Sequence, residues 1–397
     1  MTPYFVTIVL VASFAFAARA VRNRQELDGP IVPGELPWNV RVLLILAVTP
    51  LILTAGLRYY MGTDFGAYYN AEKVFGGHLW QSIMELNEPG LPLLVEIISK
   101  FSHDGGVYIF VFSLITVSLS TYSILKYTED YVFALLLYVF CGLWHGSFNG
   151  VRQYLAATIV LLGHRLILER KFWKYLLTVF VAFCFHSSAA VMIVPFFVMR
   201  NRINFGNILL LTVGTMLVAL NYETVFRFVG FLKEKDVVMN EYATNSVNIL
   251  RVLANVAPAA FAIIMFWKKE PTTEEMFYIN GLIINAAAMI AASNSAYLAR
   301  VCIHTSVFLP IALPKLVHME NPRLESLFRA GTIMLFGIFW YFEVSSYSSL
   351  NNFQWIWSRA LSQNEDLPQD LVFAVDELSR YVVCTISPLL LRSSLCD

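Results

Sequence analysis

Charged residues are scarce in this chain. They make up 14% of its 397 residues, whereas a soluble domain typically contains about 25%. Basic and acidic residues number 28 each, so no net charge attracts nucleic acid. Together with 57% hydrophobic residues and a mean hydropathy of +0.61, this scarcity excludes a soluble enzyme, a disordered chain and a nucleic-acid-binding protein.

Metal-binding patterns are also lacking. The five cysteines form no C-x-x-C motif, and none stands beside a histidine at zinc spacing. Most of the cysteines lie within apolar runs, where a free thiol packs as a small apolar side chain. The sequence therefore predicts neither a metal site nor a cofactor.

Long apolar segments are what the sequence does have. A helix crosses the hydrocarbon core of a membrane in roughly 20 residues. Candidate spans lie at 4–18, 42–57, 105–125, 131–147, 151–168, 206–225, 249–267, 276–293, 297–317, 328–345 and 371–391. We therefore expect an all-α polytopic membrane protein with about 11–14 transmembrane helices, in a single membrane domain over residues 1–397.

Two further apolar stretches do not fit one ordinary span. Residues 90–101 are too short to cross and contain Glu96 and Lys100, which favours a re-entrant or interfacial helix. Residues 172–199 are long for one span and short for two. The first part, up to Phe185, covers only about 21 Å of a core about 30 Å thick. This length favours a helical hairpin that turns at His186, with a single span as the alternative.

The loop charges predict the orientation. Basic residues near the membrane favour the cytoplasmic side, and segment 19–41 holds Arg19, Arg22, Arg24 and Arg41. This assignment places the longer segments 58–104, 226–248 and 346–370 on the outer side. The spaced aromatic residues of 346–370 are typical of an amphipathic helix lying on the membrane.

Four polar clusters interrupt the apolar pattern, and on the hairpin topology all four face outward. Ionisable groups at such positions are costly and are candidates for function. The clusters contain Arg58, Gly62, Asp64 and Tyr68; Glu88, Pro89 and Gly90; Asn149, Gly150, Arg152 and Gln153; and His186, Ser187 and Ser188. Arg300 is a fifth, isolated candidate.

Each candidate also has a structural explanation. Arg152 stands in the first turn of a helix, where a cation opposes the helix dipole unless an anion is near. A salt bridge to Asp64 or Glu88 would provide that anion. Glu88 would then be a helix cap, and His186 a hydrogen-bonded core residue.

Several outward arginines favour an anion with many oxygens. Arginine binds phosphate in bidentate fashion and keeps its charge, so two or three in one place are typical of a pyrophosphate site. The aromatic residues predicted near the same face are suited to stacking against sugars.

Taken together, these segments resemble the EpsG-like family of bacterial exopolysaccharide and O-antigen polymerases (Wzy-type). The family's R-x-x-x-G-x-D-x-x-x-Y stretch matches Arg58, Gly62, Asp64 and Tyr68, and its E-P-G matches Glu88, Pro89 and Gly90. Its N-x-x-R-Q matches Asn149, Arg152 and Gln153, and its F-H-x-S-A matches Phe185, His186, Ser188 and Ala189. Arg300 matches a later arginine near an outer membrane end.

The resemblance implies a GT-C-like glycosyltransferase in the bacterial inner membrane. Such polymerases join oligosaccharide repeat units linked to undecaprenyl pyrophosphate on the periplasmic or outer face, with lipid pyrophosphate as the leaving group. They use no nucleotide sugar. Membrane lipid, a flippase and a chain-length regulator are the further partners that the resemblance implies.

The same resemblance suggests roles for the named residues. We expect Arg58, Arg152 and Arg300 to stabilise the leaving pyrophosphate. Tyr68, Asn149 and Gln153 are expected to line the substrate site. The base that activates the acceptor hydroxyl is Asp64, Glu88 or His186. We favour Glu88 or His186, with Asp64 orienting an arginine. The lack of a D-x-D motif agrees with a metal-independent reaction.

Three other functions use some of the same features. A flippase or transporter of lipid-linked sugars would also have outward arginines, but it would add charges facing both sides and repeated halves, which the sequence lacks. An O-antigen ligase shares the substrate and is expected to carry a larger outer loop. A sugar-modifying acyltransferase would place its histidine towards cytoplasmic acyl-CoA.

Overall fold

The chain is almost entirely helical. The computed structural model describes residues 1–28, 36–85, 88–200, 213, 215–217, 246–317, 321–346 and 348–358. Within these ranges the strands are two short ones that pair with each other, so the expected all-α membrane fold is confirmed. Most of the predicted segments 206–225 and 226–248, and all of 371–391, lie outside the described residues.

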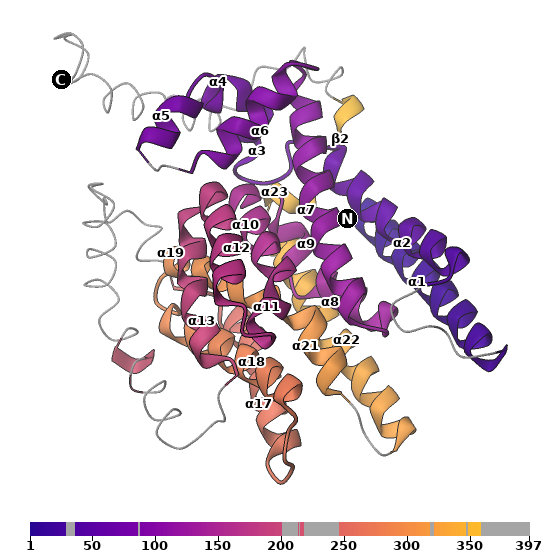
Figure 1. Cartoon of the computed structure of the whole chain (residues 1–397). Coiled ribbons are helices and arrows are strands. Elements are labelled where there is room, and N and C mark those ends of the chain that lie inside the picture. Colours follow the sequence, from indigo (N-terminus) through magenta and orange to yellow (C-terminus); the bar gives the residue numbers. More distant parts are fainter. Residues whose placement is uncertain are drawn as a thin grey trace.

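Five helices of the described part are long and apolar enough to cross a membrane. They are α1 (Thr2–Asp28), α2 (Trp38–Gly56), α7 (Gly105–Tyr127), α17 (Ile249–Phe266) and α22 (Pro322–Ser346). Each coincides with a predicted span. Helices α1 and α2 run side by side along one flank of the bundle (Figure 1).

Other predicted spans consist of shorter helices separated by breaks. Span 131–147 contains α8 (Tyr131–Phe140) and α9 (Leu143–Gly146), which separate at Gly142 with a φ of +84°. Span 151–168 contains α10 (Val151–Leu162) and α11 (His164–Leu168), which separate at Gly163. Span 297–317 contains α19 (Ala296–Ala299), η2 (Arg300–Cys302), α20 (Ile303–Ser306) and α21 (Leu309–Leu316), whereas 276–293 is one helix, α18 (Thr273–Ala291).

Residues 172–199 form the expected helical hairpin. Helix α12 (Phe172–Phe185) ends at His186, after which η1 (Ser187–Met192) and α13 (Ile193–Val198) run back along it. The Tyr175 hydroxyl donates to the Met192 carbonyl oxygen at 2.8 Å, and the ring centroids of Phe172 and Phe197 are 5.6 Å apart. The start of α12 therefore lies beside the end of α13.

Short helices cover one end of the bundle (Figure 1). They are α3 (Phe65–Tyr69), α4 (Ala71–Phe75), α5 (Leu79–Met84) and α6 (Gly90–Ser99). Helix α6 is the short, non-spanning helix expected from residues 90–101. It packs against both α7 and α12, so it lies over the end of the hairpin.

The segment after α22 joins the same end of the bundle. It contains α23 (Ser348–Asn351), β2 (Gln354–Trp355) and η3 (Ile356–Ser358). Strand β2 pairs antiparallel with β1 (Arg58–Tyr59). The expected amphipathic helix over 346–370 is therefore wrong for its described part, because backbone pairing with β1 holds residues 354–355 extended. The rest, 359–370, lies outside the described residues.

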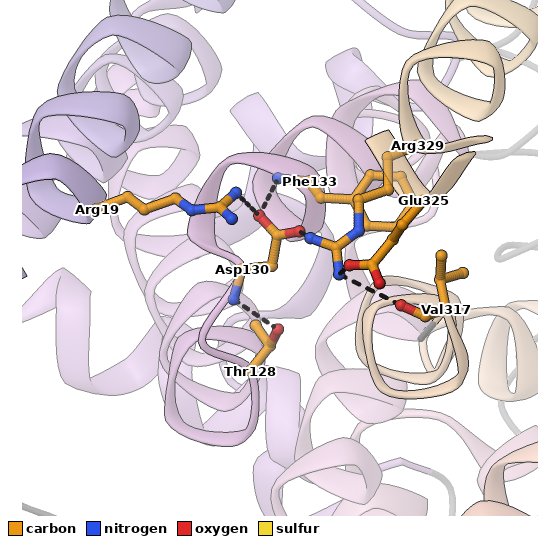
Figure 2. Close-up of polar contacts among 7 residues, drawn as sticks. All are labelled: Arg19, Thr128, Asp130, Phe133, Val317, Glu325 and Arg329. Atoms are coloured by element: carbon orange, nitrogen blue, oxygen red, sulfur yellow. Dashed lines mark hydrogen bonds and ion pairs between the residues drawn. The ribbon is translucent and has the colours of Figure 1, made fainter. Parts of the chain in front are cut away.

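Asp130 joins three helices at the end of the bundle that the loop charges predict to be cytoplasmic (Figure 2). Its carboxylate accepts from Arg19 of α1 at 3.0 Å and from Arg329 of α22. Its Oδ1 also accepts from the Phe133 amide at the start of α8, at 3.4 Å. Glu325 pairs with Arg329 at 2.6 Å. Because Asp130 is only 9% exposed, losing its charge would leave the two guanidinium groups without their shared anion.

We predict that Asp130→Asn lowers the free energy of unfolding by about 3 kcal/mol, since it removes a buried negative charge that two arginines share. Glu129→Gln is the matched control: Glu129 pairs with Arg22 at 2.9 Å but is 83% exposed. We expect the control to cost less than about 1 kcal/mol. Thermal unfolding in detergent, followed by tryptophan fluorescence, measures both. Equal costs for the two variants would contradict the central role of Asp130.

Candidate functional site

Glu88 connects three of the four predicted polar clusters. Its Oε2 accepts a hydrogen bond from Arg152 Nη1 at 2.6 Å, and its Oε1 accepts from the Ser187 amide at 2.8 Å. Arg152 belongs to the first turn of α10, and Ser187 follows the turn of the hairpin. The salt bridge that the sequence offered for Arg152 is therefore present, with Glu88 rather than Asp64 as the partner. We call Glu88, Arg152, His186, Ser187, Ser188 and His304 the Glu88 cluster.

The backbone around Glu88 is shaped for close packing. Glu88 has a φ of +54°, a left-handed conformation that costs a residue with a side chain about 1–2 kcal/mol. A Cβ on Gly90 would lie 2.9 Å from the Cys184 carbonyl oxygen and equally close to the Phe185 ring. The absence of a side chain at Gly90 thus lets the start of α6 approach the end of α12, which places Glu88 beside the hairpin turn.

Glu88 is ionised at neutral pH. Burial raises its pKa, but the charge of Arg152, the nearby His186 and the hydrogen bonds from Ser187 together outweigh burial and hold the pKa below its ordinary value. A permanent carboxylate at this place balances the cation that opposes the dipole of α10.

Arg152 keeps part of its side chain accessible. Its side chain is 35% exposed, compared with 13% for Glu88. The guanidinium also interacts with the Tyr68 hydroxyl and lies 5.8 Å from the centroid of the Phe75 ring. Among the described residues, no acceptor lies within hydrogen-bond distance of its Nε. Arg152 is thus fixed by Glu88, with a buried, unpartnered Nε and a side chain that remains partly accessible.

Arg58 is placed differently from the sequence expectation. The sequence predicts contact with a ligand, but Arg58 is only 1% exposed. It donates to Ser113 Oγ at 2.8 Å and to the Ala55 carbonyl oxygen, and its guanidinium carbon lies 4.6 Å from the centroid of the Phe148 ring. Burial lowers its pKa to about 10, which still leaves it charged at neutral pH. These contacts fix the end of α2, the turn after it and the segment before α10.

Asn149 holds the turn that carries Asp64. Its Oδ1 accepts from the Thr63 amide at 2.7 Å. The Thr63 hydroxyl donates to Asp64 Oδ1 at 3.2 Å, and in the described part of the chain no hydrogen bond reaches Asp64 Oδ2. The charge of Asp64 acts on both Arg152 and Tyr68, so this half-buried carboxylate lies near the Glu88 cluster.

Gln153 is buried, whereas Arg300 is exposed. Gln153 is 8% exposed, and its Oε1 would lie 3.5 Å from a Cβ placed on Gly150. Arg300 is exposed on η2, which packs against η1, and it forms no ion pair with any described residue. Arg300 is therefore a second accessible cation next to the segment that carries Ser187 and Ser188.

His304 belongs to the cluster, although no motif in the sequence pointed to it. Its Nε2 is 2.7 Å from Ser188 Oγ, and the same oxygen is 2.7 Å from His186 Nδ1. His304 is 0% exposed and lies in α20, 116 residues after Ser188. The one local signal is its position four residues after Arg300 in an apolar segment. Across the described ranges, no three His, Cys, Asp or Glu side chains gather to form a metal site.

One protein family matches most of the chain. The sequence model of the EpsG family matches residues 41–357, which include every residue of the Glu88 cluster. The chain belongs to the EpsG family. Membership of the EpsG family suggests an exopolysaccharide polymerase-like function. No curated protein and no solved structure matches the chain.

We predict that Gly62→Ala disturbs the site more than Gly77→Ala. Both glycines have positive φ, +101° and +74°, so both variants bear the left-handed cost of about 1–2 kcal/mol. Only at Gly62 would the new Cβ collide, at 2.5 Å from Asn149 Oδ1; around Gly77 nothing lies within 4 Å. The free energy of unfolding should fall roughly 1–2 kcal/mol further for Gly62→Ala. Thermal unfolding of both variants in detergent tests this difference, and equal losses would show that Asn149 is not packed against Gly62.

Proposed function

We propose that this EpsG-family protein is a polysaccharide polymerase of the bacterial inner membrane. It joins oligosaccharide units linked to undecaprenyl pyrophosphate on the outer face. The observation that carries the proposal is the partly exposed side chain of Arg152, which Glu88 holds in place. The charge of Asp64 acts on it, and Arg300 adjoins the neighbouring segment η1. A charged donor held in place before the substrate arrives is what a developing phosphate charge requires.

The proposed reaction transfers the growing chain to a single lipid-linked unit. A hydroxyl oxygen of the single unit attacks the anomeric carbon of the growing chain. The bond from that carbon to the pyrophosphate oxygen breaks, and its electron pair leaves with undecaprenyl pyrophosphate. The proton of the attacking hydroxyl passes to a carboxylate. The product remains attached to the lipid pyrophosphate of the acceptor.

Arg152 and Arg300 are the cations that we assign to the leaving group. Both are accessible, and arginine donates two hydrogen bonds to phosphate oxygens in a fixed plane. Arg58 has a different role in this proposal. Because its donors are directed to protein oxygens, it positions the turn before Asp64 and does not contact substrate.

Asp64 is the carboxylate that we assign as the base. The sequence favoured Glu88 or His186, but Glu88 uses one oxygen for Arg152 and the other for Ser187. His186 uses its Nδ1 for Ser188. Asp64 Oδ2 is the oxygen that no described donor occupies, and it therefore has room to accept a proton from a substrate hydroxyl.

Arg152→Lys is the sharpest test of the leaving-group assignment. Lysine keeps the positive charge beside Glu88, so the fold should be retained, but it loses the planar pair of donors. We expect polymer formation to fall by about 100-fold or more. The readout is the polysaccharide ladder on a gel, from cells in which the variant replaces the native gene. Arg165→Lys is the matched control, because Arg165 is similarly exposed (38%) and forms its ion pair with Glu274 at 3.0 Å near the other end of α10.

The pattern of products decides between functions. Loss of the ladder with single units retained supports polymerisation. Loss of single-unit material as well would indicate a flippase or a ligase instead. A ladder that is unchanged in Arg152→Lys and in Arg152→Ala would reduce Arg152 to a structural partner of Glu88.

Asp64→Asn tests the assignment of the base. The amide keeps the shape and the Thr63 hydrogen bond but cannot take a proton, so we expect the rate of chain extension to fall by roughly 100-fold or more. The level of folded protein should stay unchanged, because Asp64 is half-buried and forms no ion pair within hydrogen-bond distance among the described residues. Extension by membranes supplied with lipid-linked units gives the rate. A loss of less than threefold would contradict the assignment.

A further inference from the structure

A cavity opens at the end of the bundle that the loop charges predict to be cytoplasmic. Its volume is about 280 Å³, and its walls come from the second half of α1, the turn before α8, α21 and α22. Among the described side chains that line it, the basic ones outnumber the acidic ones: Arg19, Arg22, Lys315 and Arg329 face Glu129 and Asp130. A polar cavity with this balance of charge is suited to an anion.

Asp130 is shared between two of these cations. Its Oδ1 accepts from Arg19 at 3.0 Å and its Oδ2 accepts from Arg329, so both of its oxygens are occupied (Figure 2). Glu325 pairs with Arg329 at 2.6 Å, but no other described carboxylate contacts Arg19. Arg19 therefore shares the one carboxylate that balances it.

Lys315 is balanced in the same incomplete way. Its Nζ lies 3.5 Å from Glu274 Oε1, and that oxygen accepts from Arg165 at 3.0 Å. Holding helices together requires only as many carboxylates as cations. Because Arg19 and Lys315 each share a carboxylate with a second cation, the cavity that they line has positive charge that helix packing does not use.

Hydrogen-bond donors accompany this charge. Arg19 donates to Asp130 through Nη1, and within the described ranges no acceptor lies within hydrogen-bond distance of its Nε or Nη2. Thr128, which is only 5% exposed, also lines the cavity. Its hydroxyl accepts from the Asp130 amide at 3.3 Å, and no acceptor among the described residues takes the proton of that hydroxyl. An oxygen-rich group that enters the cavity can accept from both residues.

We propose that this cavity binds a phosphate group, held by Arg19, Lys315 and Thr128. A guanidinium presents paired N–H donors in a plane that fits two phosphate oxygens, an ammonium adds a compact charge, and a hydroxyl donates to a further oxygen. The site lies apart from the Glu88 cluster and does not depend on the proposed polymerase activity.

The surroundings favour an anionic phospholipid as the source of that phosphate. Arg19 directly follows the apolar residues of the first predicted span, 4–18, which places it where hydrocarbon meets head groups. Phe16 lies one turn earlier on the same face of α1 and is 65% exposed, so it offers apolar surface to an acyl chain. Basic pockets between transmembrane helices on the cytoplasmic side bind anionic head groups. A soluble phosphate compound would use the same donors without Phe16.

Titration of the full chain in detergent with phosphatidylglycerol, followed by native mass spectrometry, tests the site. We expect phosphatidylglycerol to bind more tightly than zwitterionic phosphatidylcholine. Arg19→Gln and Lys315→Gln should each weaken this binding by roughly fivefold, the effect of losing one cation beside an anionic head group. Lys315→Gln leaves the ion pairs of Asp130 intact, so a loss in this variant does not come from altered contacts between α1 and α22.

Arg24→Gln is the matched control. Arg24 is exposed on α1 near the same end of the bundle but does not line the cavity. We expect this variant to weaken binding by less than about twofold. A loss as large as that of Lys315→Gln would show that only the general charge of this end attracts lipid, and it would overturn the proposal.

Inorganic phosphate distinguishes the two sources. Tighter binding of phosphatidylglycerol that depends on Arg19 and Lys315 supports a lipid. A rise in unfolding temperature with inorganic phosphate that Lys315→Gln abolishes, without a preference for phosphatidylglycerol, supports a soluble phosphate compound in the same cavity. If neither probe depends on Arg19 and Lys315, the phosphate site is overturned. None of these measurements uses polysaccharide, so their failure leaves the polymerase assignment unaffected.

Discussion

The ion pair between Arg152 and Glu88 determines how the end of the bundle covered by the short helices is assembled. A cation in the first turn of a helix opposes the helix dipole, and a largely buried carboxylate is costly without a counter-charge. Each residue supplies the counter-charge that offsets the free-energy cost of the other. Because the second oxygen of Glu88 accepts from Ser187, segments 64 and 99 residues apart meet at one carboxylate. The short helix α6, the start of α10 and the hairpin turn are therefore fixed together.

Breaks in the helices make room for this polar group within a membrane protein. Non-helical backbone at membrane depth is tolerated where it is buried in protein or lines a polar space. The hairpin reverses at His186, where the extended backbone leaves the Ser187 amide free to bond Glu88 and the Ser188 amide free to bond His186. A continuous helix would use both amides internally. The interruption that shortens α12 thus supplies the donors that organise the site.

Sequence reasoning reached the features that depend on local pattern. Apolar length predicted the membrane fold, and the insufficient reach of residues 172–185 predicted the hairpin. The dipole argument predicted an anion beside Arg152 and named Glu88 as one of two candidates. Burial of Arg58 was not predictable, because its position beneath Phe148 depends on how α2 meets the segment before α10. His304 was missed for the same reason. Its hydrogen bond to Ser188 joins residues that are 116 apart in the sequence, and no local sequence pattern predicts a contact at that distance.

Arginine–carboxylate contacts occur at both ends of the bundle, so charge pairing alone does not identify a functional site. The Asp130 carboxylate accepts hydrogen bonds from arginines of α1 and α22, and these contacts hold the long helices together (Figure 2). Such a network needs only balanced charge. The Glu88 cluster contains in addition a hydrogen-bonded chain from His186 through Ser188 to His304. Since helix packing does not require such a chain, its place beside Arg152, whose side chain remains partly accessible, favours a role in binding or transfer.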